Sequence, residues 1–178
     1  MALLKAPYLN EGVKAAFIFC CYTGLRWVDV KKLSWKDIKG NVLTTRIIQA
    51  KTVLPVTLTL HPIAQTILAN QKKKISHSDV QSKVFRLPTA NGANKVLNQW
   101  VKSAGIDKYI TWSCARLSFS IFLQDQNVDD ATVAYLMGHS TTEQVRKTYK
   151  RHRPKNQEQS INHLPSPEQV LYFLTQPG

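Results

Sequence analysis

The first part of the sequence has the hydrophobic periodicity of a helix. In residues 8–26, "YLNEGVKAAFIFCCYTGLR", apolar residues recur every three or four positions. Asn10 is a residue type that caps helix N-termini, and Gly24 is a residue type that ends helices. The pattern therefore predicts an amphipathic helix between these two residues. The side chains expected to face the core are those of Val13, Ala16, Phe17 and Cys20.

Further along the chain, the spacing of apolar residues changes from that of a helix to that of β-strands. A short helix is predicted within residues 26–38. After it, residues 41–49 and 53–60 alternate apolar with polar positions and are rich in β-branched side chains. We expect two strands joined around residues 50–52. Pro55 has no backbone N–H to donate, so the second strand is expected at an edge or at a bulge.

Helical spacing returns after the strands. Pro62 suits the first position of a helix, and in the helix predicted at residues 113–126 we expect Phe119, Phe122 and Leu123 to face the core. Together these patterns predict a mostly α fold with a small antiparallel β-sheet, of the α+β class. The predicted later helices are 62–74, 93–105, 113–126, 129–138 (capped by Asp129 or Asp130), 141–149 (capped by Thr141) and 166–174 (capped by Ser166).

Composition limits the number of domains and the compartment. The 178 residues, 43% of them hydrophobic, suit a single domain at 1–178, with a core at about 10–153 and a tail at 154–178. The longest apolar run, residues 15–21, is too short to cross a bilayer, and no signal peptide is recognisable. The three cysteines lack metal-ligand spacing. We expect a reduced, cytoplasmic protein that does not bind membranes.

Charge narrows the choice of partner. Lys and Arg number 24 against 11 Asp and Glu, a formal net charge of +13. Such an excess attracts polyanions, above all nucleic acid. The basic residues are spread along the chain and do not form the basic amphipathic helix of a membrane-surface protein.

Several polar residues lie where helices are predicted to begin or end. Arg26 directly follows a glycine-ended helix, and Asp29 comes three residues later. Arg116 lies in the first turn of an apolar helix, three residues after Ser113, so it begins next to the core. A positive charge there generally needs a partner, and we expect an anionic one. Helix ends also suit phosphate binding, because free N–H groups converge there.

Three further residues belong to this set. Lys51 is expected at the tip of the hairpin, and His139 follows Gly138 at a helix end. Tyr149 lies among lysines and arginines in "VRKTYKRHR". Taken singly, each has an ordinary explanation: a solvated lysine, a histidine that compensates a helix dipole, or an aromatic that merely packs. Arg26 and Asp29 could likewise be a simple helical ion pair.

The order of these residues resembles the catalytic domain of tyrosine recombinases, the phage-integrase family, and most of all integrases of bacterial mobile elements. The resemblance runs from about Asn10 to Tyr149. "TGLRWVDVKKLSW" is similar to the first arginine box of the family, "SCAR" to the second, and "LMGHS" to the histidine box. The family fold is mostly helical with a small sheet. The catalytic residues that the resemblance implies are Arg26, Lys51, Arg116, His139 and the nucleophile Tyr149, supported by Asp29 and Ser113.

The resemblance implies a site-specific recombinase that cleaves and rejoins DNA. Tyr149 would form a 3′-phosphotyrosyl link, while Arg26 and Arg116 neutralise the phosphate, since guanidinium groups bind phosphate bidentately. Lys51 would protonate the departing 5′-oxygen, and His139 would hydrogen-bond the phosphate. No metal, ATP or other cofactor is expected. The implied partner is double-stranded DNA, with no small-molecule substrate, in a bacterial cytoplasm and at the nucleoid.

One departure from the family pattern leaves a second hypothesis open. Ser113 stands where the family usually has histidine, and serine cannot titrate near neutral pH. The chain could therefore be a DNA-binding module that retains the recombinase fold without catalysis. The family's N-terminal DNA-binding domains are also expected to be absent. A basic RNA-binding protein would explain the charge but not the ordered boxes.

The end of the chain predicts a contact between copies. In the family a terminal helix often docks on a neighbouring protomer, and the full-length protein would assemble as a tetramer on DNA. The alternative is that this helix packs on its own domain. The apolar residues that it offers are Val170, Leu171, Phe173 and Leu174.

Overall fold

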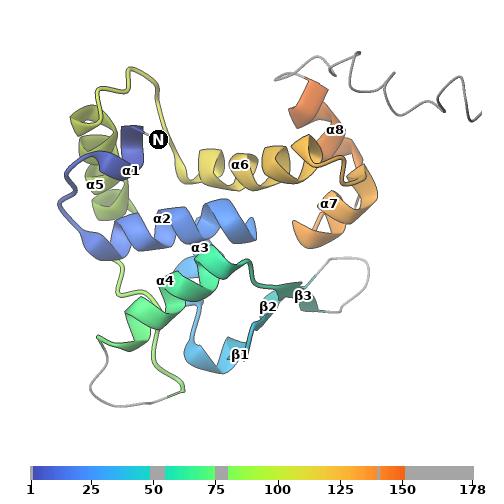
Figure 1. Cartoon of the computed structure of the whole chain (residues 1–178), viewed down its shortest axis with the longest axis horizontal. Helices are drawn as coiled ribbons and strands as arrows, with labels where there is room; N and C mark the ends of the chain where they lie inside the picture. Colours follow the sequence, from blue (N-terminus) through green and yellow to red (C-terminus); the bar gives the residue numbers. More distant parts are fainter. Residues whose placement is uncertain (1, 49–54, 75–79, 140, 151–178) are drawn as a thin grey trace, which may run out of the picture.

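A computed structural model describes residues 2–48, 55–74, 80–139 and 141–150. Within them the chain forms mostly helices and one small antiparallel sheet, as the sequence predicts (Figure 1). The predicted terminal helix and its docking face lie outside the described residues. The elements in chain order are α1 (Ala2–Lys5), α2 (Glu11–Thr23), α3 (Trp27–Lys32), the 3-10 turn η1 (Trp35–Asp37), β1 (Ile38–Lys39), β2 (Val42–Ile48), β3 (Pro55–Thr59), α4 (Pro62–Lys72), α5 (Ala90–Ser103), α6 (Trp112–Asp125), α7 (Asp130–Leu136) and α8 (Glu143–Lys150).

The core forms where α2 packs lengthwise against α6 (Figure 1). All four residues predicted to face inward from α2 are buried. The ring of Phe17 meets the rings of Trp100 in α5 and Trp112 in α6, at centroid distances of 5.9 and 5.6 Å in edge-on arrangements. Aromatic side chains bury a large apolar area and favour such edge-to-face contacts. These contacts join three helices and hold α6, which carries Arg116, against the end of α2.

Side-chain caps and glycines define where several helices begin and end. Asn10 accepts a hydrogen bond from the Val13 N–H at 3.0 Å and begins α2, as predicted. Gly24 ends that helix with φ +66°, a left-handed conformation that favours glycine. Of the two aspartates considered for α7, Asp129 is the cap, since it accepts from the Thr132 N–H at 2.9 Å.

The sheet has the order β1-β2-β3, with both pairs antiparallel. Val42 pairs with Thr59 and Leu43 with Leu58, and the register is irregular between Thr44 and Ile48. Leu43 and Leu58 are buried, as expected for a sheet with one face on the core. The strand that contains Pro55 lies at an edge of the sheet, as predicted. The segment that joins β2 to β3, including Lys51, lies outside the described residues.

Several details differ from the sequence prediction: α1 was not predicted, and α5 begins at Ala90, three residues before the predicted start. Phe122 is 50% exposed and does not face the core, whereas Phe119 is buried and Leu123 packs against the core. The ring of Phe122 lies near that of Tyr22 in α2, with the centroids 6.1 Å apart. α8 begins one residue later than predicted. The N–H of Arg146 bonds to the Thr142 carbonyl at 3.0 Å, which puts Thr142 and not Thr141 at the start of the helix.

The helices are short relative to a bilayer. Among the residues that the structure describes, no helix has both the length and the apolar character needed to cross a membrane.

Candidate active site

The first arginine begins a helix next to the end of another. Arg26 occupies the N-cap position of α3, two residues after the left-handed Gly24 that ends α2. Its side chain is exposed, and its backbone N–H donates to the Asp29 carboxylate at 3.3 Å. Asp29 therefore fixes the backbone at Arg26. Its negative charge at the first turn of α3 also suits the positive end of the helix dipole.

The second arginine connects three backbone segments. Arg116 lies in α6 and is partly buried. Its Nη1 donates to the Gly24 carbonyl, and its Nη2 donates to the Met137 carbonyl and contacts His139 Nε2 at 2.9 Å. The sequence predicted an anionic partner for this charge. Among the described residues its hydrogen-bond partners are instead two main-chain carbonyls and an imidazole.

The C-terminal end of α7 brings His139 to this arginine. Gly138 adopts φ +65°, and the N–H of His139 bonds back to the Ala134 carbonyl at 2.8 Å. A guanidinium can only donate, so His139 Nε2 must be the acceptor in its contact with Arg116. The proton of the neutral ring then lies on Nδ1, which is buried and has no hydrogen-bond partner among the described residues. His139 is thus held as a single neutral tautomer.

The pKa values agree with this arrangement. Burial, then the charges of Arg116 and Arg26, lower the pKa of His139 to about 4. Burial, then the charge of Arg26, lower the pKa of Arg116 to about 10, and the negative charges of Asp29 and of Cys20 when ionised oppose part of this shift. At neutral pH the site therefore holds a charged guanidinium and a neutral imidazole. The charge of Arg26 contributes to lowering the pKa of both groups.

An anion would relieve this concentration of positive charge. Of the five N–H groups of a guanidinium, the Nε–H and one Nη1 hydrogen of Arg116 have no partner among the described residues. Arg26 is exposed and has its side chain available. Guanidinium groups bind phosphate oxygens through such N–H groups. The free N–H groups of Arg116 and the exposed Arg26 are thus of the chemical type that binds phosphate.

The remaining predicted site residues are placed as follows. Ser113 is exposed in the first turn of α6, where it lines a pocket of about 230 Å³ with Trp27 and Thr111. Tyr149 lies within α8, but its side chain is outside the described part of the chain. Lys51 lies outside the described residues altogether. The structure thus places Arg26, Arg116 and His139 near one another. It does not test the predicted roles of Lys51 and Tyr149.

Sequence reasoning missed the two carbonyls that hold Arg116. Both belong to helix ends, the last free carbonyls of α2 and α7, which have no partner within their own helix. The glycines in "TGLR" and "MGHS" were the available signal, because each marks such an end.

Comparison with known proteins agrees with the geometry. The sequence matches the profile described as "Phage integrase family" over residues 3–156. The chain belongs to the phage integrase family. A search of curated proteins finds no match to this integrase-family chain.

Solved structures of tyrosine-recombinase type have the same fold as this integrase-family chain. XerA recombinase superposes with a TM-score of 0.65 at 17% identity, covering 91% of this chain and 66% of the other. The Tn1549 transposon integrase, in complex with circular intermediate DNA, gives 0.62 at 16% identity, covering 86% and 58%. The lambda integrase catalytic core gives 0.56 at 20% identity, covering 72% and 80%. The chain spans 66% of the XerA recombinase and 45% of a lambda integrase bound to its core site.

Proposed function

We propose that this chain is the catalytic domain of a DNA strand transferase that acts through a phosphotyrosyl intermediate. The observation that carries the proposal is the convergence of Arg26, Arg116 and His139 at the ends of α2, α6 and α7. These residues come from segments up to 113 positions apart in a basic chain of net charge +13. Two guanidinium groups beside a neutral imidazole suit the binding of a phosphodiester.

In the proposed reaction Tyr149 releases its phenolic proton to water, which the surrounding positive charge favours, and its oxygen attacks phosphorus. The new bond joins this oxygen to the 3′-phosphate, and the bond from phosphorus to the 5′-oxygen breaks. Lys51 donates the proton that the departing 5′-oxygen takes up. Arg26 and Arg116 stabilise the extra negative charge of the transition state. Rejoining is the reverse, with a 5′-hydroxyl as the nucleophile, so the phosphoester energy is retained and neither ATP nor a metal ion is consumed.

The preorganised guanidinium of Arg116 is central to this proposal. Its two carbonyl partners fix its position before any substrate arrives, so little reorganisation is required when charge develops. His139 adds a neutral imidazole that contacts Nη2 of Arg116, the nitrogen that also donates to the Met137 carbonyl. With Nε2 accepting from Arg116, the neutral ring keeps one N–H, on Nδ1, as its remaining hydrogen-bond donor.

Covalent trapping tests the proposal. The chain is mixed with a library of duplexes that each carry a nick, so that the short cleaved strand diffuses away and rejoining fails. We expect a protein–DNA adduct that survives denaturation and that Tyr149→Phe abolishes. Tyr135→Phe is the matched control, because Tyr135 is an exposed tyrosine on the neighbouring helix α7. An adduct that persists in Tyr149→Phe would refute the assignment of the nucleophile.

A second candidate is a non-catalytic DNA-binding module, favoured by the exposed Ser113 at the position where the family usually has histidine. It predicts DNA binding that weakens steeply with salt and no adduct on any duplex of the library. Ser113→His tests the cause that this candidate assumes: if the missing histidine removed catalysis, the variant should form an adduct that the wild-type chain does not form.

A further inference from the structure

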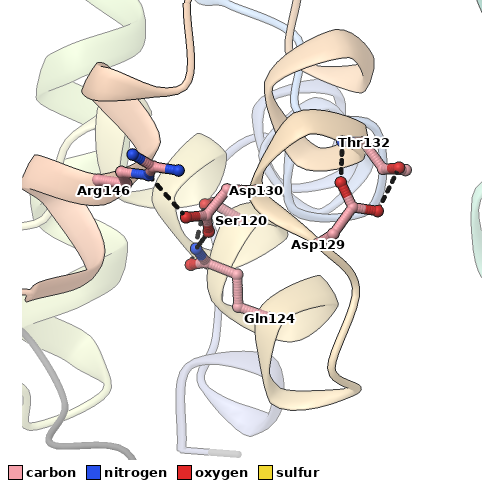
Figure 2. Close-up of polar contacts among 6 residues, drawn as sticks. All are labelled: Ser120, Gln124, Asp129, Asp130, Thr132 and Arg146. Carbon is pink, nitrogen blue, oxygen red and sulfur yellow. Dashed lines mark hydrogen bonds and ion pairs between the residues drawn. The ribbon is translucent and has the colours of Figure 1, made fainter.

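A chain of polar contacts joins the three helices α6, α7 and α8 (Figure 2). Asp130 is the first residue of α7, and its two carboxylate oxygens bond to different helices. Oδ1 accepts from Gln124 Nε2 of α6 at 3.1 Å, and Oδ2 accepts from Arg146 Nε of α8 at 3.2 Å. One carboxylate therefore fixes the distance between the helix that carries Arg116 and the helix that carries Tyr149.

The inner end of this chain of contacts is buried. Gln124 is 8% exposed and Ser120 only 2% exposed. The Ser120 hydroxyl donates to Gln124 Oε1 at 3.4 Å. With Oε1 accepting and Nε2 donating, the orientation of the amide is determined. Gln124 thus presents its N–H to Asp130 from a rigid, buried position, and the carboxylate receives a fixed direction from it.

α8 depends on contacts outside itself. A helix of eight residues is too short to be stable alone in water. Val145, 1% exposed, provides its apolar contact with the domain. An apolar contact is not directional, so it does not by itself set the rotation of the helix. Arg146 is the next residue along, and its hydrogen bond to Asp130 supplies a direction. Tyr149 follows three residues later in the same helix.

We propose that Asp130 and Arg146 are positioning residues for strand cleavage: together with Gln124 they fix α8, and with it Tyr149, relative to Arg116. This inference rests on the proposed function of Tyr149. Neither residue touches the phosphate in this scheme. Their effect is on the fraction of molecules in which α8 is docked for attack.

A second ion pair in α8 provides the comparison. Lys147 and Glu143 lie 2.7 Å apart as an i,i+4 pair within α8, with side chains 73% and 68% exposed. This pair joins two residues of one helix and fixes no other helix. Lys147→Gln removes the same charge as Arg146→Gln, and Glu143→Gln removes the same charge as Asp130→Asn. The two controls therefore report what loss of charge alone does to DNA binding.

The test separates DNA affinity from the cleavage rate. Asp130→Asn removes a negative charge from a DNA-binding protein, so electrostatics alone would leave DNA affinity unchanged or improved. We expect Asp130→Asn and Arg146→Gln to slow adduct formation at saturating nicked duplex by about 5-fold, the upper range for a partly exposed ion pair. Lys147→Gln and Glu143→Gln should keep the wild-type rate at saturation. The double variant Asp130→Asn/Arg146→Gln should be no slower than either single variant, because both remove one contact.

Hydrogen exchange tests the docking independently of chemistry. In the Tyr149→Phe background, we expect the amides of residues 143–150 to exchange several-fold faster in Asp130→Asn and Arg146→Gln than in Lys147→Gln. Unchanged exchange and an unchanged rate in Asp130→Asn would overturn the inference. If exchange rises as expected but the wild-type chain forms no adduct, the positioning contact stands and the proposed function fails. Arg146→Lys, which keeps a cation, should recover part of the rate.

Discussion

Two structural features at Gly24 require a residue without a side chain, and one substitution can test both. Its φ of +66° is costly for any residue with a side chain, about 1–2 kcal/mol for alanine. A Cβ at this position would also lie 2.6 Å from Cδ1 and 3.0 Å from Cε1 of Phe119. Phe119 is only 7% exposed, so its ring has little room to move, and overpacking of this kind typically costs about 1–3 kcal/mol. Gly24→Ala should therefore lower the free energy of unfolding by about 2–5 kcal/mol.

Two other glycines allow the steric cost at Gly24 to be separated from the cost of the left-handed backbone. Gly40 and Gly105 have φ of +59° and +66°, and a Cβ at either would meet nothing within 4 Å. Alanine at these positions pays only for the left-handed backbone, about 1–2 kcal/mol. Urea unfolding of the three variants, followed by circular dichroism, gives the difference directly. The excess for Gly24→Ala should shrink when Phe119→Leu is added, since the two changes meet in one contact.

The same substitution has a functional consequence. The Gly24 carbonyl accepts from Arg116, so a shift of this backbone moves the guanidinium. We expect Gly24→Ala to slow adduct formation under conditions where it is still folded, and Gly105→Ala to leave the rate unchanged. If Gly24→Ala and Gly40→Ala lose equal stability, the close approach of Phe119 is wrong. If Gly24→Ala cleaves at the Gly105→Ala rate, the carbonyl does not position Arg116.

The remaining predictions concern the charges and thiols at the same helix ends. The pKa of His139 in the folded chain, about 4, lies below its ordinary value of 6.5. As pH falls, the unfolded chain therefore binds a proton at this histidine before the folded chain does. The stability that the neutral His139 contributes is complete above pH 6.5 and is lost as pH falls toward 4. Urea unfolding of wild type and His139→Gln at pH 7 and pH 5 should show a smaller pH dependence in the variant, and equal slopes would contradict the shift. Arg116→Lys replaces two nitrogens, each bonded to a different carbonyl (Gly24 and Met137), by a single Nζ, and it should lower the free energy of unfolding by about 1–3 kcal/mol in the same assay. Burial raises the pKa of the Cys20 thiol and raises that of Cys21 to about 12, so both should react slowly with iodoacetamide at pH 8, and mass spectrometry should find them labelled only after denaturation.

Most of the fold was predictable because local signals agree with the tertiary structure. Asn10, Gly24 and Asp129 act on the nearest backbone groups, so their effect can be read from a few residues of sequence. The strands were recognisable because one face of the sheet packs on the core and imposes a period of two. One detail that was wrong depends on coverage by elements distant in the sequence. Phe122 has the spacing of a core residue, but its side chain is 50% exposed.

The site was predictable in part for a similar reason. The arginines, the histidine and their order could be recognised from the sequence, whereas the partner of Arg116 could not. That partner is a pair of main-chain carbonyls whose direction is set by how α2 and α7 end against α6. Main-chain atoms leave no residue-type signature. The contact from Asp130 to Arg146 was missed too, because the two residues lie 16 positions apart in different helices.

The three contacts of Arg116 affect the choice of an inactive variant for crystallisation with uncut DNA. Its guanidinium holds the ends of α2 and α7 together in addition to its proposed contact with phosphate, so a variant lacking it would lose structural contacts as well as the proposed function. Inactivity of such a variant would have two explanations at once. Tyr149→Phe removes one hydroxyl and no charge, and it leaves the hydrogen bonds of Arg116 to the ends of α2 and α7 in place.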